Sequence, residues 1–182
     1  PARSMIEVAR IVGLGEKVET VTIYLPENRH LVIFDLGSIQ VTAALIDGNF
    51  PDYEAILPKQ SDTISQVYTK DLLRACKRSE VFAKDSGDAA LLNIRPSANG
   101  PGEIIISSRS QELGENIGTL DASIDGDAIE ISFNIKYLID VLNIIREDQV
   151  YLQTSGLSSP GVVKPVGRDD FLHIIMPMSS SR

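Results

Sequence analysis

Pairs of adjacent apolar residues recur along the chain at a nearly constant interval. The pairs lie 67 and then 66 residues apart, at Met5-Ile6, Leu72-Leu73 and Leu138-Ile139. Each pair falls in a stretch with the spacing of an amphipathic helix, and runs of β-branched and apolar residues separated by turn residues follow each stretch. A repeat of this length predicts a single supersecondary unit, a helix followed by an antiparallel strand meander, that occurs three times.

The expected helices span residues 1–12, 69–79 and 135–146. The expected strands span residues 18–25, 30–35, 39–46, 63–66, 89–95, 102–107, 116–123, 128–133, 150–154, 161–166 and 171–178. Two units should pack into an α+β domain, because a single helix-and-meander unit leaves one face uncovered. Residues 59–182 are expected to form one complete domain, with both helices on one face of antiparallel sheets. Residues 1–58 are expected to form half of another domain, whose preceding unit we expect in the natural protein before Pro1.

The composition narrows the class of protein. The 182 residues are 43% hydrophobic, and no apolar run approaches the ~20 residues of a membrane-spanning helix, so no membrane partner is expected. A single cysteine, Cys76, excludes an internal disulfide and favours a cytoplasmic location. Its place on the apolar side of a predicted helix favours core packing over catalysis. A net charge of −8 argues against a protein that grips nucleic acid over its whole surface.

A proline-flanked stretch, residues 45–59, separates the first unit from the rest of the chain. Asp47-Gly48 ends the preceding strand, because glycine accepts the positive φ of a tight turn. Pro51 and Pro58 restrict the backbone on either side of a run rich in aromatic and aliphatic residues. This pattern predicts a stiff and partly buried connector between two domains.

Three stretches in the same order resemble segments of one protein family. Residues 45–59, LIDGNFPDYEAILPK, resemble the segment that joins the second and third domains of the bacterial DNA polymerase III beta subunit, the beta sliding clamp. Residues 133–142, FNIKYLIDVL, resemble the last inner helix of the family, and residues 173–178, HIIMPM, resemble its C-terminal signature. The resemblance implies the DNA-clamp fold, with residues 1–58 as the second half of the middle domain and its connector, and residues 59–182 as the third domain.

The resemblance also implies a function. Sliding clamps are non-catalytic processivity factors of bacterial DNA replication. When full length, they close head to tail into homodimeric rings that encircle duplex DNA without reading its sequence. They tether the DNA polymerase III alpha subunit, the clamp loader and repair polymerases through short linear peptides. The expected partners are therefore duplex DNA and these proteins, and no cofactor is expected.

Basic residues form a stripe on the second predicted helix. Lys70, Arg74 and Lys77 fall at i, i+4 and i+7, opposite the apolar side of that helix. Periodicity alone favours an ordinary solvated helix face, whereas the resemblance implies a positive lining of the ring that faces the phosphate backbone. The residues expected to face DNA are Arg3, Arg10, Lys70, Arg74, Lys77 and Lys136.

The sequence Met176-Pro177-Met178 predicts a small apolar cleft, because two flexible thioether side chains flank a proline that lacks a backbone donor. The alternative is a final core strand, above all for Ile175. In the family, this region and the connector bind partner peptides. The residues that the resemblance assigns to this pocket are Pro51, Ala55, Ile56, Asn134, Tyr137, Leu157, Ile174, Met176, Pro177 and Met178. Many clamps carry a basic residue at the position of Ala55, so a polar contact to the peptide is expected to be lost.

The resemblance further implies a subunit interface on the third domain. The matching residues are Val81 and Phe82, after the basic stripe, and Glu112 and Glu115 in an acidic strand region. Phe82 fits the core equally well. Because the sequence contains no match to the first domain, we expect these 182 residues to be unable to close a ring.

Enzymatic chemistry has little support in the sequence. His173 lies three residues after Asp170, but it falls in a predicted strand and no nucleophile motif accompanies it. Two histidines are too few for a histidine-based metal site, and Asp125-Gly126 fits a hairpin turn better than a calcium loop. We therefore expect neither catalysis nor a metal. The remaining alternative is a protein-interaction scaffold that uses the same apolar pocket without DNA encirclement.

Overall fold

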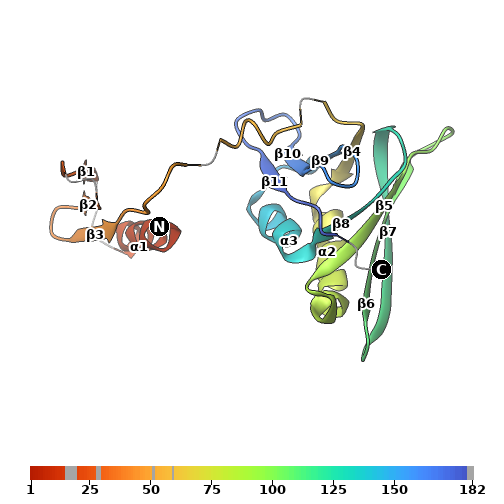
Figure 1. Ribbon diagram of the computed structural model, residues 1–182, viewed down its shortest axis with the longest axis horizontal. Coiled ribbons are helices and arrows are strands. Elements are labelled where there is room, and N and C mark those ends of the chain that lie inside the picture. The colour runs from red at the N-terminus through yellow and green to blue at the C-terminus, as the bar shows by residue number, and fades with distance from the viewer. Residues whose placement is uncertain (15–19, 28–29, 51, 59, 180–182) are drawn as a thin grey trace. The chain divides into compact units, whose positions relative to one another are not determined.

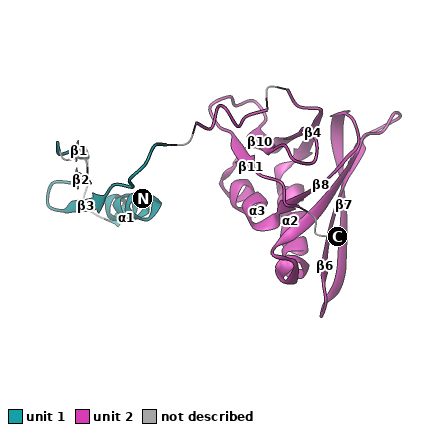
Figure 2. Cartoon of the chain, in the orientation of Figure 1, with its two compact units in different colours: residues 1–51 teal, residues 52–182 magenta. Residues whose placement is uncertain are grey.

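The computed structural model of the chain describes residues 1–14, 20–27, 30–50, 52–58 and 60–179 (Figure 1). The chain contains two compact units, Pro1–Pro51 and Asp52–Arg182 (Figure 2). The division falls inside the proline-flanked connector, earlier than the expected boundary between residues 58 and 59. The later part of the connector therefore belongs to the second unit.

The first unit consists of one helix and one three-stranded antiparallel sheet, as the repeat predicts. Helix α1 spans Ala2–Leu14, and strands β1, β2 and β3 span Thr22–Tyr24, Leu31–Asp35 and Gln40–Ala44. The strands lie in chain order across the sheet. The strands are shorter than expected, and residues 18 and 19 of the first expected strand lie outside the described residues.

The side of α1 that packs on the sheet differs from the side suggested by its apolar spacing. Val8 is buried against residues of β2 and β3, and Ile11 packs beside it. Met5, Ile6 and Val12 are exposed. The buried cluster of this unit is small, and the sheet contributes only short, alternating apolar positions to it. The sheet therefore covers only the middle of the helix, at Val8 and Ile11.

The second unit repeats the order strand, helix, three strands. The first half contains β4 (Thr63–Tyr68), α2 (Thr69–Ala83), a short 3-10 helix η1 (Lys84–Ser86), β5 (Ala89–Arg95), β6 (Gly102–Ser110) and β7 (Gly114–Gly126). The second half contains β8 (Ile129–Asn134), α3 (Ile135–Ile144), β9 (Gln149–Thr154), β10 (Gly161–Pro165) and β11 (His173–Ile175). The duplication predicted from the interval between apolar pairs is confirmed.

The two halves exchange their first strands. The strand order is β11-β10-β9-β4-β7-β6-β5-β8, so β4 pairs with β9 of the other half and β8 pairs with β5. Strand β7 joins the two meanders, because residues 114–122 pair with β6 and residues 123–126 pair with β4. At the opposite end, the Met178 amide donates to the Ser132 carbonyl of β8 at 2.8 Å. The tail after β11 therefore follows β8 and nearly closes the sheet.

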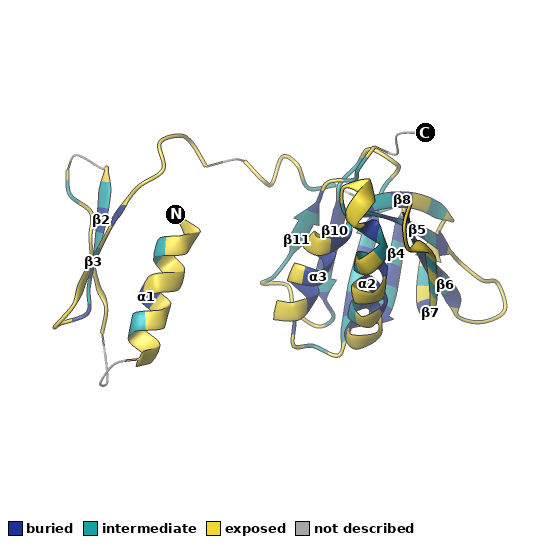
Figure 3. Cartoon of the chain, turned by 90° about the horizontal axis from the view of Figure 1, so that it is seen from below, coloured by how far each residue is buried: buried dark blue, intermediate teal, exposed yellow. Residues whose placement is uncertain are grey.

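Equivalent hydrogen bonds anchor the two helices. The Ile135 amide at the start of α3 donates to the Asp88 carbonyl at 2.8 Å, and the Thr69 amide at the start of α2 donates to the Asp148 carbonyl at 2.9 Å. Asp88 and Asp148 each directly precede the first strand of a meander. Helices α2 and α3 pack together against one side of the sheet (Figure 3). This is the α+β arrangement that the repeat predicts.

The core of the second unit lies between these helices and the sheet. Helix α2 buries Leu72, Ala75 and Cys76, and α3 buries its own apolar side in the same cluster. Burial raises the pKa of the Cys76 thiol to about 12, so the thiol stays protonated. Ile175 is 3% exposed, which confirms the core interpretation for that residue.

Two element ends differ from the expectation. The last helix ends at Ile144 rather than at residue 146, because Ile145 adopts extended backbone angles and buries its side chain. The final strand spans His173–Ile175 rather than residues 171–178. The tail leaves β10 to run beside β8, and Pro177 has no amide to donate to a ladder. Met176, Pro177 and Met178 therefore lie beyond the strand in which they were expected.

The interpretation of Asp125-Gly126 as a hairpin turn is wrong. Both residues lie in β7 and pair with Ile64 and Thr63 of β4. Gly126 adopts a φ of +111°, and a Cβ atom there would lie 2.0 Å from the Asp62 carbonyl oxygen. The glycine is thus required by a close approach of two strands and by its backbone angle, instead of by a turn.

Candidate functional site

The second unit leaves several large apolar side chains in solvent. Ile56, Tyr137, Leu157 and Met176 are 46%, 57%, 72% and 58% exposed. Exposed apolar side chains that gather in one region mark a contact surface, because burying them on a partner releases free energy. All four belong to the peptide pocket predicted from the sequence.

The start of α3 presents two of the predicted pocket residues. Asn134 caps the helix, since its Oδ1 atom accepts a hydrogen bond from the Lys136 amide at 3.0 Å. Its Nδ2 group makes no hydrogen bond within the described residues. Tyr137 lies in the first turn with its side chain exposed. This end of α3 therefore offers an exposed aromatic ring next to an amide donor.

The C-terminal tail lies beside the strand that leads into α3. The hydrogen bond from the Met178 amide joins the tail to Ser132, two residues before Asn134. Pro177 and Met178 are half-buried, whereas Met176 is exposed. The structure therefore brings the tail residues close to the start of α3, as the pocket prediction requires.

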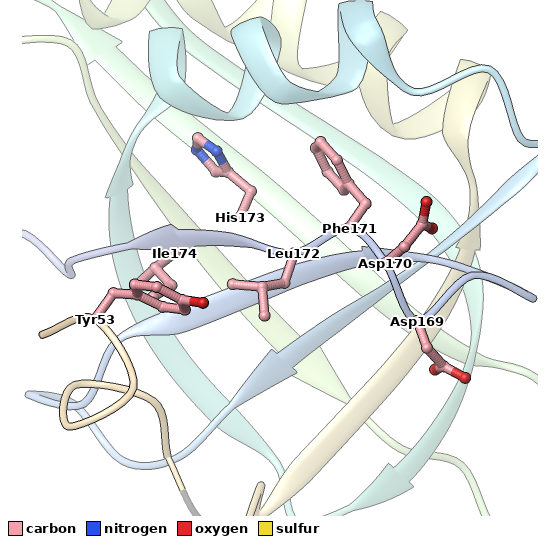
Figure 4. A pocket seen from close by; sticks show the side chains of 7 residues that line it. All are labelled: Tyr53, Asp169, Asp170, Phe171, Leu172, His173 and Ile174. Atoms are coloured by element: carbon pink, nitrogen blue, oxygen red, sulfur yellow. The ribbon is translucent and has the colours of Figure 1, made fainter. Parts of the chain in front are cut away.

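A hollow of about 490 Å³ lies between the connector and the last strand (Figure 4). Tyr53 and residues 169–174 line it. The Tyr53 ring lies next to Ile174 with its hydroxyl end toward Leu172, whereas His173 and Phe171 point toward α3. Ile174 is a predicted pocket residue, while Tyr53 and Leu172 are additional to the prediction. Leu172 lies two residues before Ile174, a spacing that places both on one side of an extended segment.

A turn in the connector holds Ile56 near this hollow. The Ile56 amide donates to the Tyr53 carbonyl at 3.1 Å, and the Ala55 amide donates to Asp52 Oδ1 at 3.3 Å. Leu157 lies in the loop between β9 and β10, and no hydrogen bond within the described residues joins it to the other pocket residues. Pro51, also assigned to the pocket, lies outside the described residues.

One end of the hollow is acidic. The Arg168 guanidinium donates from Nε and Nη2 to Asp170 at 2.8 and 2.9 Å, and from Nη1 to Glu147 at 3.1 Å. These bonds hold the pKa of Asp170 below its usual value. Partial burial lowers the pKa of His173, although Asp140 opposes this shift. Both carboxylate oxygens of Asp170 accept hydrogen bonds from Arg168, so the expected candidate partner of His173 is engaged elsewhere.

The exposed side of α2 carries the predicted cationic stripe. Lys70, Arg74 and Lys77 are exposed, and the opposite side of the helix is buried. Arg74 forms an ion pair with Asp71 at 3.1 Å. Lys70 and Lys77 form no ion pair within the described residues. These two ammonium groups are therefore available to an anionic partner.

The other residues expected to face DNA lie in different settings. Lys136 on α3 forms an ion pair with Asp88 at 2.8 Å, and this hydrogen bond raises the pKa of Lys136. Arg10 pairs with Glu7 on α1, while Arg3 forms no ion pair in the part of the chain that is described. Arg3 and Arg10 belong to the first unit, so the second unit alone contributes the stripe on α2 and Lys136.

Two of the four expected interface residues, Glu112 and Glu115, lie at or beside an open strand edge. Val81, toward the end of α2, is 48% exposed, and Phe82 is half-buried. Glu112, in the turn after β6, and Glu115, in β7, are exposed. In the described structure, residues 114–122 pair with β6 on one side only, which leaves backbone groups on the other edge open to another strand.

The described residues contain neither a cluster of side chains that could bind a metal ion nor a helix that could span a membrane. They contain no group of three or more His, Cys, Asp or Glu side chains arranged to hold a metal ion. Helices α1, α2 and α3 contain 13, 15 and 10 residues. No helix in the described ranges is long and apolar enough to cross a membrane.

Comparison with known proteins decides the family. Residues 54–179 match the family described as DNA polymerase III beta subunit, C-terminal domain. The chain belongs to the DNA polymerase III beta subunit family. The beta sliding clamp of Pseudomonas putida is 28% identical over 178 residues, and that of Staphylococcus aureus is 27% identical over 179 residues. These alignments cover 98% of this chain but 46% and 45% of the two clamps, so the chain spans about half the length of these relatives.

Solved beta subunit structures share the clamp fold. The DNA polymerase III subunit beta of Pseudomonas aeruginosa superimposes with a TM-score of 0.85 at 29% identity, covering 98% of this chain and 47% of that one. The sliding clamp of Bacillus subtilis gives a TM-score of 0.84 at 27% identity, covering 99% and 46%. The expected α+β clamp fold is therefore confirmed. A further P. aeruginosa clamp, at 29% identity and a TM-score of 0.82, was solved bound to griselimycin.

Proposed function

We propose that this beta subunit chain acts as part of a sliding clamp, a non-catalytic processivity factor of bacterial DNA replication. Residues 1–58 form the second half of the middle domain with the connector, and residues 59–182 form the third domain. The complete protein is a homodimeric ring around duplex DNA. Val81, Phe82, Glu112 and Glu115 contribute to its subunit interface, and the open edge of β7 supports this assignment.

The observation that supports a peptide site is the exposure of Tyr137 and Met176 beside the start of α3. A short peptide from the DNA polymerase III alpha subunit, the clamp loader or a repair polymerase buries its apolar anchors on these side chains. The Nδ2 group of Asn134 donates a hydrogen bond that fixes the position of the peptide. Ala55 offers only a methyl group, so no charged contact forms at that position.

The cationic stripe on α2 supports contact with duplex DNA. Lys70, Arg74 and Lys77 face solvent on one side of the helix. Flexible ammonium and guanidinium groups attract phosphates without reading bases, so the contact is independent of DNA sequence and weakens with salt. Encirclement holds the ring on DNA, and the stripe provides a surface on which the ring slides.

Binding of a fluorescein-labelled peptide derived from the polymerase tests the peptide site. In anisotropy titrations of the 182-residue chain, Met176→Ala combined with Met178→Ala is expected to weaken binding about ten-fold or more, because two apolar contacts are lost. Met5→Ala is the matched control, since Met5 is an exposed methionine on α1. An unchanged affinity in the double variant contradicts the assignment.

The second candidate function is an interaction scaffold that uses the same apolar surface without encircling DNA. The exposed apolar residues at α3 and the tail are compatible with both a scaffold and a clamp, whereas the cationic stripe on α2 favours the clamp. Full-length protein loaded on circular DNA separates the two. A clamp stays bound to the closed circle and is released when the DNA is linearised, whereas a scaffold shows no dependence on DNA topology.

A further inference from the structure

The hollow between Tyr53 and residues 169–174 has two ends of different character (Figure 4). Leu172 and Ile174 lie beside the Tyr53 ring and give one end an apolar wall. Asp169 and Asp170 lie at the other end, and both are exposed. A volume of about 490 Å³ is large enough for one or two side chains of a bound segment.

The acidic end retains unbalanced negative charge. Arg168 is the nearby cation in the sequence, but its guanidinium already bonds both Asp170 and Glu147. Asp169 makes no ion pair or side-chain hydrogen bond within the described residues. Two carboxylates therefore share one guanidinium, and Asp169 takes no part in the ion pairs of the described residues. His173, which also lines the hollow, is half-buried and points toward α3, and burial lowers its pKa.

We propose that this hollow extends the peptide site and binds a partner segment in which an apolar residue lies a few positions from a lysine or arginine. The apolar side chain packs between Tyr53 and Leu172, and the cationic group contacts Asp169. Asp169 and Leu172 lie three residues apart in the chain, and the chain bends at residues 169 and 170. Because an extended peptide advances ~3.3 Å per residue, its cationic residue is expected within about three positions of the apolar residue. An acidic segment is disfavoured at the same place, because it meets the unbalanced carboxylates.

This inference rests on the proposed peptide function, because Ile174 belongs both to the predicted pocket and to the hollow. A peptide anchored beside α3 and the tail can therefore continue along the last strand without leaving the surface. The hollow adds selectivity among partner peptides, because it favours those with a positive charge near their anchor residues.

Three versions of one polymerase-derived peptide test the proposal by anisotropy on the 182-residue chain. The first is the parent peptide, the second carries a Leu-Ala-Ala-Lys extension, and the third carries Leu-Ala-Ala-Glu. Each extension is placed at the amino end in one set and at the carboxyl end in another. In one of the sets, the lysine version is expected to bind about three-fold more tightly than the glutamate version, with the difference shrinking at high salt.

Two variants identify the residues responsible. Asp169→Asn is expected to abolish the difference between the lysine and glutamate versions while leaving the parent peptide unaffected. Asp125→Asn is the matched control, because Asp125 is another exposed aspartate that forms no ion pair within the described residues, and it lies on β7, whereas Asp169 lies in the loop between β10 and β11. Leu172→Ala is expected to weaken both extended versions about three-fold or more, through lost apolar contact, and to leave the parent peptide unchanged.

The outcomes separate this inference from the proposed function. If the parent peptide binds, but the lysine and glutamate versions bind equally in both sets, the extension is refuted and the peptide site stands. If Asp169→Asn and Asp125→Asn behave alike, the extension is also refuted. If the parent peptide does not bind at all, the proposed function and the inference that rests on it both fail.

Discussion

Helices α2 and α3 occupy equivalent places in the duplicated halves of the second unit, yet their exposed sides differ. Both bury an apolar side in one shared core. The exposed side of α2 carries the cationic stripe of Lys70, Arg74 and Lys77, whereas the only cation of α3, Lys136, is paired with Asp88 and lies next to the exposed Tyr137. The buried sides of the two helices are therefore alike, whereas the charges and apolar residues on their exposed sides differ. One duplicated fold can therefore present different surfaces to different partners.

The junction between the two halves should tolerate the least change. Gly126→Ala is expected to lower the free energy of unfolding by about 3 kcal/mol or more, since the new Cβ meets the Asp62 backbone and the φ is positive. Urea denaturation of the chain measures the loss. Gly118→Ala is the matched control in the same strand, because the nearest atom to its Cβ is 4.0 Å away. Equal stability of the two variants would mean that β7 does not bridge the meanders as described.

The buried side of α2 should be chemically inert. Cys76 is fully buried and its pKa is raised from 9.0 to about 12, so its reaction with a thiol reagent at pH 8 is expected to be at least ~100-fold slower than in urea-unfolded chain. Lys77→Cys in a Cys76→Ala background places a thiol on the exposed side and should react rapidly. Fast labelling of native Cys76 would contradict the assignment of the two sides.

The exposed side of α2 is expected to contribute to DNA binding and not to peptide binding. Arg74→Glu combined with Lys77→Glu in the full-length protein is expected to lower retention on circular DNA and to reduce the salt slope of binding by about two. Peptide affinity should stay unchanged. Arg95→Glu combined with Arg146→Glu serves as a control with the same change in net charge at exposed positions off α2. Equal effects of the two double variants would argue against a specific DNA-facing stripe.

The smallest effects are expected at two buried hydroxyls in the sheet. Ser65 and Thr154 have no hydrogen-bond partner within the described residues, so Ser65→Ala and Thr154→Val should change the free energy of unfolding by less than about 0.5 kcal/mol or increase it. Ser108→Ala provides the contrast, because Ser108 bonds Ser79 on α2 through its hydroxyl at 2.8 and 2.9 Å. It should cost about 1–3 kcal/mol. A large loss at Thr154 would reveal a partner for its hydroxyl.

Much of the fold can be predicted from the sequence, because buried apolar residues recur at equivalent positions of the two halves of the second unit. The apolar pairs at Leu72 and Leu138 predict the two helices, and both side chains are fully buried where the repeat places them. In α1, Met5, Ile6 and Val12 stay exposed while Val8 and Ile11 pack on the sheet, as expected for half a domain that leaves apolar helix surface uncovered. The end of the last strand was missed, because the pairing of Met178 with β8 is a long-range contact that local patterns do not contain.

The candidate site was less accessible to sequence reasoning. Its residues lie far apart in the chain. The assignment of Asn134 and the tail residues to one pocket therefore depends on a family resemblance, because the spacing of residues in the sequence does not indicate it. The hollow at Tyr53 was missed for a related reason. The apolar run of the connector indicates a buried tether, but only the three-dimensional arrangement shows that its tyrosine lines one hollow with Leu172 and Ile174 (Figure 4).

The central claim is that a peptide site at the start of α3 and the tail is separate from the basic side of α2. Photo-crosslinking a polymerase-derived peptide to the 182-residue chain, followed by mass-spectrometric mapping, tests it most directly. The claim predicts adducts at Tyr137, Met176 or Met178. Adducts on the exposed side of α2, around Lys70 and Lys77, would contradict it.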